Sequence, residues 1–207
     1  MQNDFEPIEL NKPSGNNRKL IVAVIVTLCV IILAIACALL VRYFVITTYI
    51  VDGHSMDPTL DGGITASADG DPAYRTDGET LILNKLATPK RGDIIVFTPH
   101  DWDITDSFGN RSTLVKRVIG VAGDHIQIIG NVVYLNGSPL DEPYIAEPMN
   151  FSYDGLDVYV TDGHLFCMGD NRNHSSDSRT YGLVSTDDVV GKCFLIKGTN
   201  GKLRTVK

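Results

Sequence analysis

Two patterns of hydrophobic positions divide the 207-residue chain. Leu20 to Val41 form an apolar run of 22 residues without charge, proline or glycine. At about 1.5 Å per residue, a helix over this run is about 33 Å long, which is enough to cross the hydrocarbon core of a membrane. After Val41 the apolar residues come in short runs separated by glycine and proline. The pattern predicts one transmembrane helix followed by a β-rich domain.

A cleavable secretory signal is the alternative for the apolar run, because Ala36 and Ala38 loosely resemble the small residues of a cleavage site. Such signals have a shorter apolar stretch, however, and this run continues past both alanines. We therefore expect a retained anchor. Arg18 and Lys19 precede the run and Arg42 alone follows it, so the positive-inside rule predicts a cytoplasmic N-terminus.

This topology gives a cytoplasmic tail at residues 1–19, a transmembrane helix at 20–42 and an extracytoplasmic domain at 43–207 of a single-pass cell-membrane protein. The last part has 165 residues, enough for one domain with its own core. It carries 14 basic and 22 acidic side chains. This negative balance argues against nucleic acid as a partner.

Nine runs rich in β-branched and aromatic residues predict the strands of the outer domain. They are Val45–Val51, Thr80–Asn84, Asp93–Thr98, Thr113–Val121, His125–Ile129, Val132–Leu135, Asp157–Val160, Leu165–Met168 and Lys192–Lys197. Gly-Asn at 130–131 and Asn-Gly at 136–137 are typical of tight hairpins, so residues 125–140 are expected to form a β-meander. Many short strands without a long amphipathic helix predict a mainly β fold, an antiparallel barrel or sandwich.

No cofactor is expected. A metal is not expected either, because the histidines are isolated and lack ligand spacing. Asp101, Asp103 and Asp106 resemble part of a calcium loop, but no glutamate follows at the required offset. Cys167 and Cys193 lie in the outer domain, where a disulfide is allowed. Two buried free thiols are the preferred interpretation, because a domain of this size does not need a crosslink.

Ser55 is the first candidate for chemistry, and it follows Val41 by 14 residues. A reactive serine held that close to a membrane acts on a substrate that is also at the membrane. A serine hydroxyl is a poor nucleophile and needs a base. His54 is adjacent on what we expect to be an extended segment, where neighbouring side chains point to opposite faces, so it cannot easily reach the hydroxyl.

Lys116 is the better candidate for the base. Strand alternation places it on one face with Leu114 and Val118. Apolar neighbours disfavour the ammonium form and lower the lysine pKa, so that a neutral amine becomes available to accept a proton. From this strand alone, a surface lysine that keeps its ammonium in water is the simpler interpretation.

Four segments together resemble, in order, the conserved boxes of the bacterial type I signal peptidases. They are Ser-Met-Asp-Pro-Thr-Leu at 55–60, Arg-Gly-Asp-Ile-Ile-Val-Phe at 91–97, Lys-Arg-Val-Ile-Gly at 116–120 with Gly-Asp at 123–124, and Gly-Asp-Asn-Arg-Asn-His-Ser-Ser-Asp-Ser-Arg at 169–179. The resemblance implies a membrane-bound serine endopeptidase that removes signal peptides from exported preproteins. It also implies a Ser/Lys dyad, with Ser55 as nucleophile and Lys116 as base.

The same resemblance implies roles for five supporting residues. Ser175 is expected to form a hydrogen bond with the lysine and to orient it. Asp177 is expected to pair with Arg179, and Asp170 with Arg117. The partners implied for such an enzyme are the signal peptides of secreted preproteins, the phospholipid membrane and a secretion translocon nearby.

An oxyanion needs preorganised donors, and the backbone N–H of Ser55 is the first candidate. Some relatives add a side-chain hydroxyl from the residue two positions before the nucleophile. This chain has Gly53 at that position and so resembles the glycine-bearing forms that are common in Gram-positive bacteria.

An extended peptide can pair with a strand edge while shallow pockets bind alternate side chains. Five apolar residues match positions that line the pockets of the family: Tyr49, Val51, Met56, Leu114 and Val115. They predict cleavage after small residues in an Ala-X-Ala pattern.

Two other functions compete with this interpretation. A self-cleaving repressor can also use a Ser/Lys pair on a related β-fold, but the apolar run at 20–41 argues against it. A membrane-tethered binding module with a degenerate peptidase domain would have lost one of the two reactive residues. Ser55 and Lys116 are both present, which favours the enzyme.

Overall fold

The computed structural model describes residues 15–63, 78–105, 109–149 and 153–206. The chain separates into two compact units, with the boundary between Tyr43 and Phe44. The predicted long helix is present as α1 (Gly15–Phe44). Its most apolar 18-residue window has a mean hydropathy of 3.4 and is not buried in the structure, so α1 is long and apolar enough to cross a membrane.

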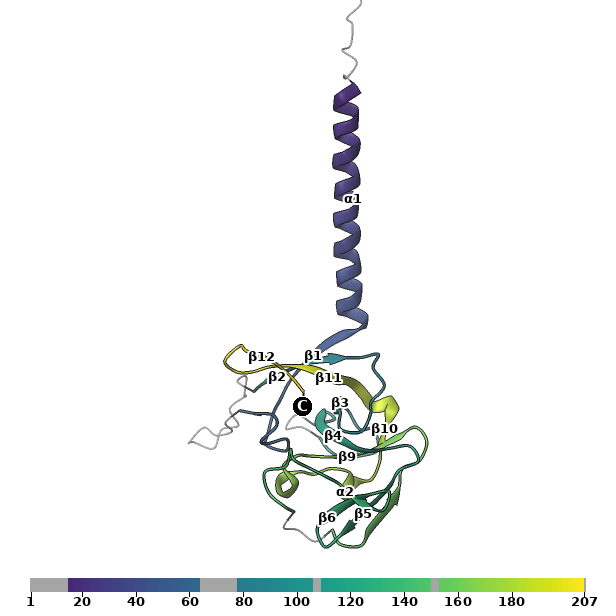
Figure 1. The fold of residues 1–207 in the computed structure, drawn as a ribbon, viewed down its shortest axis with the longest axis vertical. Helices are drawn as coiled ribbons and strands as arrows, with labels where there is room; N and C mark the ends of the chain where they lie inside the picture. Colours follow the sequence, from purple (N-terminus) through teal and green to yellow (C-terminus); the bar gives the residue numbers. More distant parts are fainter. Residues whose placement is uncertain (1–14, 64–77, 106–108, 150–152, 207) are drawn as a thin grey trace, which may run out of the picture. The chain divides into compact units, whose positions relative to one another are not determined.

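Eight strands of the second unit form a curled antiparallel sheet (Figure 1). The strand order is β1-β2-β11-β3-β4-β9-β10, with β12 paired to β11. These strands are β1 (Ile46–Ile50), β2 (Thr80–Asn84), β3 (Ile94–Phe97), β4 (Leu114–Val121), β9 (His164–Met168), β10 (Val184–Ser185), β11 (Val189–Lys197) and β12 (Leu203–Thr205). Because β4 lies between β3 and β9, its backbone is paired on both sides. The residues of β4 are buried except at its two ends, Leu114 and Val121.

The remaining four strands form a second antiparallel sheet in the order β7-β6-β5-β8. They are β5 (His125–Ile129), β6 (Val132–Leu135), β7 (Ser138–Pro139) and β8 (Leu156–Tyr159). Gly130 and Asn131 have φ of 56° and 64°, and Asn136 and Gly137 have φ of 53° and 81°. Two consecutive residues with positive φ are what a type I′ hairpin turn requires, so the predicted meander is confirmed.

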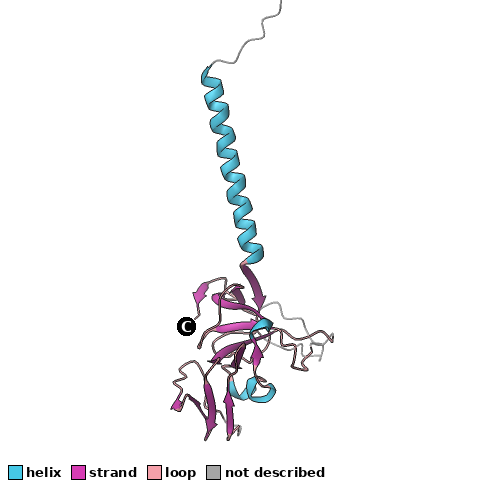
Figure 2. Cartoon of the chain, turned by 90° about the vertical axis from the view of Figure 1, so that its right-hand side faces the viewer, coloured by secondary structure: helices cyan, strands magenta, loops and turns pink. Residues whose placement is uncertain are grey.

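Helical segments in the second unit are short, and strands dominate it (Figure 2). They follow β9 as the 3₁₀ turn η1 (Arg172–His174), the helix α2 (Ser178–Tyr181) and the 3₁₀ turn η2 (Thr186–Asp188). The side chain of Asp177 accepts a hydrogen bond from the backbone N–H of Arg179 and so caps α2. This run of turns folds the residues after β9 back toward the interior of the sheet.

The mainly β fold expected from the sequence is confirmed, and all nine predicted strands are present. The three strands that were not predicted, β7, β10 and β12, have two or three residues each. Pro139 in β7 lies at the edge of its sheet, where the missing backbone N–H costs no ladder bond. Such short segments become strands through pairing, which local residue preference does not predict.

The core contains separate clusters of buried hydrophobic side chains. One cluster brings Met56 and Leu60, which follow Ser55 in the chain, against Leu81 and Val115. Burial of these two side chains anchors the segment that carries Ser55 to the sheet.

Cys167 and Cys193 are both buried free thiols, as expected. They belong to different hydrophobic clusters.

Candidate active site

The structure brings Ser55 and Lys116 together, although 61 positions separate them in the sequence. The amino group Nζ of Lys116 lies 2.8 Å from Oγ of Ser55 and 3.0 Å from the carbonyl oxygen of Val115. Lys116 is 3% exposed and lies on an interior strand. The alternative of a surface lysine on a sheet edge therefore does not fit the structure.

Burial lowers the pKa of Lys116 from 10.5 to about 8. The nearby Asp177 carboxylate acts in the opposite direction, because a negative charge stabilises the ammonium form. At a pKa of about 8, roughly a tenth of the molecules hold the neutral amine at pH 7. The environment therefore makes a proton acceptor available beside the Ser55 hydroxyl.

Residues 53–60 form a series of bends and turns, so the expectation that His54 lies on an extended segment is wrong. Gly53 has φ of 83°, which a side chain disfavours, and the chain reverses there. Met56 is fully buried and pulls the turn inward. His54 remains outside, with Nδ1 3.0 Å from Oδ2 of Asp57, and among the described residues its ring makes no hydrogen bond to the Ser55 hydroxyl.

The residues directly after β9 also contact the turn at residues 53–60, which is called the Ser55 turn below. Asn171 donates its backbone N–H to the carbonyl oxygen of Ser55 at 3.1 Å and its side-chain amide to that of His54 at 2.9 Å. A Cβ atom on Gly169 would collide with both the Ser55 carbonyl oxygen and the Ser175 hydroxyl, so only glycine fits there. Sequence reasoning did not single out Gly169 or Asn171, although both lie in the matched segment 169–179.

Arg117 and Asp170 form the first of the two expected ion pairs. The guanidinium of Arg117 donates to both carboxylate oxygens of Asp170, at 2.8 and 2.7 Å, and both side chains are buried. Oδ2 of Asp170 also accepts a hydrogen bond of 2.5 Å from the hydroxyl of Thr59. The Ser55 turn and the strand that carries Lys116 are therefore linked through one carboxylate.

Asp177 and Arg179 form the second expected ion pair, with an Nε–Oδ1 distance of 2.8 Å and no exposure of either side chain. Asp177 also accepts hydrogen bonds from the backbone N–H of Gly169 and the hydroxyl of Ser175. The structure thus differs from the expected geometry of Ser175, whose hydroxyl donates to Asp177 at 2.8 Å. Within the described residues, no hydrogen bond joins Ser175 to Lys116. A carboxylate is the stronger acceptor, which accounts for this choice.

Four of the five residues expected to contact substrate lie together. Val51, Met56 and Val115 belong to one buried cluster, and Tyr49 packs against it. Leu114 is the exception, since it packs against a different cluster. Because these side chains also form the core next to Ser55, packing accounts for their burial as well.

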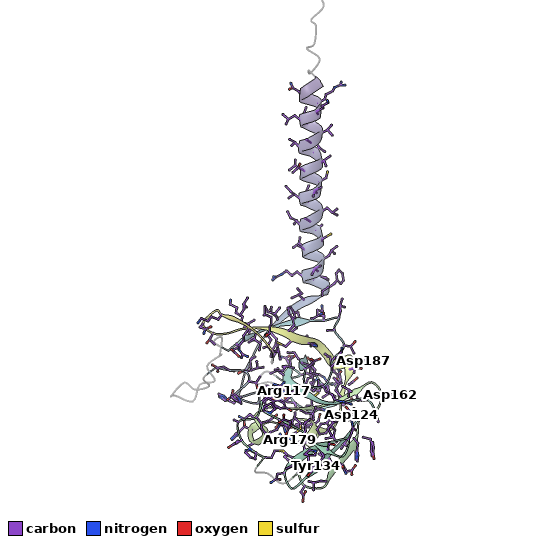
Figure 3. The ribbon with its side chains drawn as sticks, viewed as in Figure 1. Arg117, Asp124, Tyr134, Asp162, Arg179 and Asp187 are labelled. Carbon is purple, nitrogen blue, oxygen red and sulfur yellow. The ribbon has the colours of Figure 1, made fainter. Side chains whose placement is uncertain are left out.

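A metal site is not formed by the described residues, which contain no suitably placed group of three or more His, Cys, Asp or Glu side chains. Of the three acidic residues that resemble part of a calcium loop, Asp101 and Asp103 are described, and Asp106 lies outside the described residues. Arg117 and Arg179, which Figure 3 labels, are 2% and 8% exposed, so both lie inside the second unit.

Comparison with known proteins gives consistent matches. Residues 22–197 match the family described as signal peptidase, peptidase S26. A probable signal peptidase I-1 from Synechocystis sp. is 33% identical over 165 residues, which cover 78% of this chain and 76% of that protein. Signal peptidase I T from Bacillus subtilis is 36% identical over 176 residues, covering 78% of each. A crystal structure of a signal peptidase I from Enterococcus faecalis is 31% identical, with a TM-score of 0.39, and covers 51% of this chain and 96% of that chain.

Proposed function

Because the chain belongs to the signal peptidase family, peptidase S26, and is a serine endopeptidase, we propose that it removes N-terminal signal peptides from exported preproteins by a Ser/Lys mechanism. The observation that carries the mechanism is the contact of 2.8 Å between the Ser55 hydroxyl and the buried amine of Lys116. A serine next to an amine whose pKa is lowered to about 8 has a base available near neutral pH.

In the first step, the neutral amine of Lys116 accepts the hydroxyl proton as Oγ of Ser55 attacks the scissile carbonyl carbon. The carbonyl oxygen becomes an oxyanion, and the N–H of Ser55, which makes no hydrogen bond to another described residue, is free to stabilise it. The ammonium of Lys116 then gives the proton to the leaving amine as the peptide bond breaks. Water attacks the acyl-enzyme in the same way, with Lys116 taking its proton and returning one to Ser55.

The preference for small substrate residues follows from the close packing of apolar side chains next to Ser55. Val51, Met56 and Val115 are buried together, so a peptide that pairs with this part of the sheet meets a wall of side chains. Only shallow contact is possible there, which favours alanine at the residue before the cut and two residues earlier. Substrate and enzyme then share backbone hydrogen bonds, as in other strand-addition complexes.

Membrane anchoring places the enzyme where its substrate is. α1 is long and apolar enough to span a bilayer, and the signal peptide of a preprotein is itself an apolar membrane segment. Arg18 and Lys19 before the span favour a cytoplasmic tail at residues 1–19. The domain at 43–207 then faces outward, close to the translocon from which preproteins emerge.

Incubating the purified full-length chain, in detergent or lipid, with a preprotein that carries one Ala-X-Ala site tests the function. N-terminal sequencing of the product should give the residue that follows the second alanine. Ser55→Ala is the matched control, because it removes a hydroxyl and little packing. An uncut preprotein, or the same product from the Ser55→Ala protein, would contradict the proposal.

A further inference from the structure

A series of contacts joins the smaller sheet to the turn that carries Ser55. The connection from β7 to β8 places the ring of Tyr144 against Arg117, with the guanidinium carbon 4.1 Å from the ring centroid. Arg117 follows Lys116 on β4 and is 2% exposed. Tyr144 belongs to none of the segments that carry the resemblance to a known family.

Arg117 is linked in turn to the segment that carries the nucleophile. It donates two hydrogen bonds to Asp170, and Asp170 accepts a hydrogen bond from the hydroxyl of Thr59, which lies four residues after Ser55. The next residue, Asn171, holds the carbonyl oxygen of Ser55 itself. Two adjacent residues, one of them paired to Arg117, thus hold the turn that carries Ser55, one at Thr59 and the other at Ser55 itself.

The ring of Tyr144 is itself held in place. Its hydroxyl donates to Oε1 of Glu142 at 3.0 Å, and Glu142 binds Arg172 at 2.9 and 2.6 Å. Arg172 is 2% exposed and donates its Nε–H to the carbonyl oxygen of Gly169 at 3.0 Å. The ring therefore lies close to two buried arginines, with the Arg172 guanidinium carbon 5.8 Å from the ring centroid.

We propose that Tyr144 is a positioning residue, whose ring keeps water from the Arg117–Asp170 ion pair and thereby fixes the Ser55 turn against Lys116. A cation is attracted to an aromatic face, and an ion pair is stronger where water is excluded. Without the ring, water competes for Arg117, Asp170 gains freedom, and the contact between Ser55 and Lys116 loosens. The loss is one of orientation of the nucleophile, so it lowers kcat rather than raising KM.

Three substitutions in the full-length chain test this inference, which rests on the proposed function. Tyr144→Leu keeps apolar volume but removes the aromatic face, and we expect kcat to fall about tenfold while KM stays within about twofold. Tyr144→Phe keeps the face and loses only the hydroxyl, so it should restore most of kcat. Tyr134→Leu is the matched control. Tyr134, labelled in Figure 3, lies on β6 of the smaller sheet, at the opposite end of the domain from β1 and β12 (Figure 1), and within the described residues it makes no contact with either arginine. Its kcat should equal that of the parent chain.

Hydrogen exchange of the backbone at residues 53–61 gives a second readout that needs no peptidase activity. Tyr144→Leu should speed exchange there, whereas Tyr144→Phe and Tyr134→Leu should not. Parental kcat and exchange in Tyr144→Leu, a change in KM alone, or equal effects of Tyr134→Leu would overturn the inference. If the parent chain cleaves no preprotein, the proposed function fails, and the exchange at residues 53–61 still decides whether Tyr144 fixes the turn.

Discussion

The rate of preprotein cleavage should rise with pH, and the midpoint of the rise should be the pKa of Lys116. Its pKa is lowered to about 8, chiefly by burial, and only the neutral amine can accept the proton of Ser55. The neutral fraction is then about one hundredth at pH 6, about a tenth at pH 7 and about nine tenths at pH 9. kcat/KM should therefore rise about tenfold per pH unit below the midpoint and level off above it.

The assay is the initial cleavage rate of one preprotein by the full-length chain, measured across this range with circular dichroism to confirm that the fold persists. The limb for kcat/KM reports the free enzyme, in which the lysine is buried as described. A flat profile would refute the reasoning, and so would a midpoint near the ordinary lysine value of 10.5. A midpoint near 6.5 would point to a histidine instead.

Three further results are expected of the site. Gly169→Ala should reduce activity by at least about tenfold and lower the melting temperature, because the added methyl group meets the Ser55 carbonyl oxygen and the Ser175 hydroxyl; parental activity would show that the site adapts. Asn171→Ala removes two hydrogen bonds to the Ser55 turn and should lower kcat about three- to tenfold with little change in KM, which steady-state kinetics measure. Replacing the alanine before the cut with phenylalanine should slow cleavage at least about hundredfold, and equal cleavage of the two preproteins would contradict the packed wall beside Ser55.

The sequence predicted most of the fold because its signals are local. Alternating apolar positions define the strands, and the Gly130-Asn131 and Asn136-Gly137 pairs dictate their hairpins. The long helix needs only composition and length. The strands β7, β10 and β12 were missed because two or three residues carry no periodic pattern.

The candidate site could be predicted only in part. Local pattern favoured a surface position for Lys116, and the resemblance to a family was needed to pair it with Ser55. The contact itself depends on the register of β4 and on the turn after Gly53, which no local signal specifies. The roles of Asn171 and Tyr144 depend on side chains from separate parts of the chain that meet only in the folded domain.

The Lys116→Met protein should be inactive but should still fold. The pKa of Lys116 is lower in the folded chain than in the unfolded one, so folding disfavours its proton. Below about pH 8 both states are protonated and the full penalty applies, and stability rises as pH increases from about 8 toward 10.5. Each pKa unit corresponds to about 1.4 kcal/mol, so methionine should stabilise the fold at pH 7 by up to about 3 kcal/mol.

The most direct test of Ser55 as nucleophile and Lys116 as base is therefore one experiment on three full-length proteins: the parent, Ser55→Ala and Lys116→Met. Cleavage of one preprotein and thermal unfolding are measured side by side at pH 7. We expect both variants to be inactive and Lys116→Met to unfold at the same temperature as the parent or higher. Substantial cleavage by a folded Lys116→Met protein would contradict this expectation.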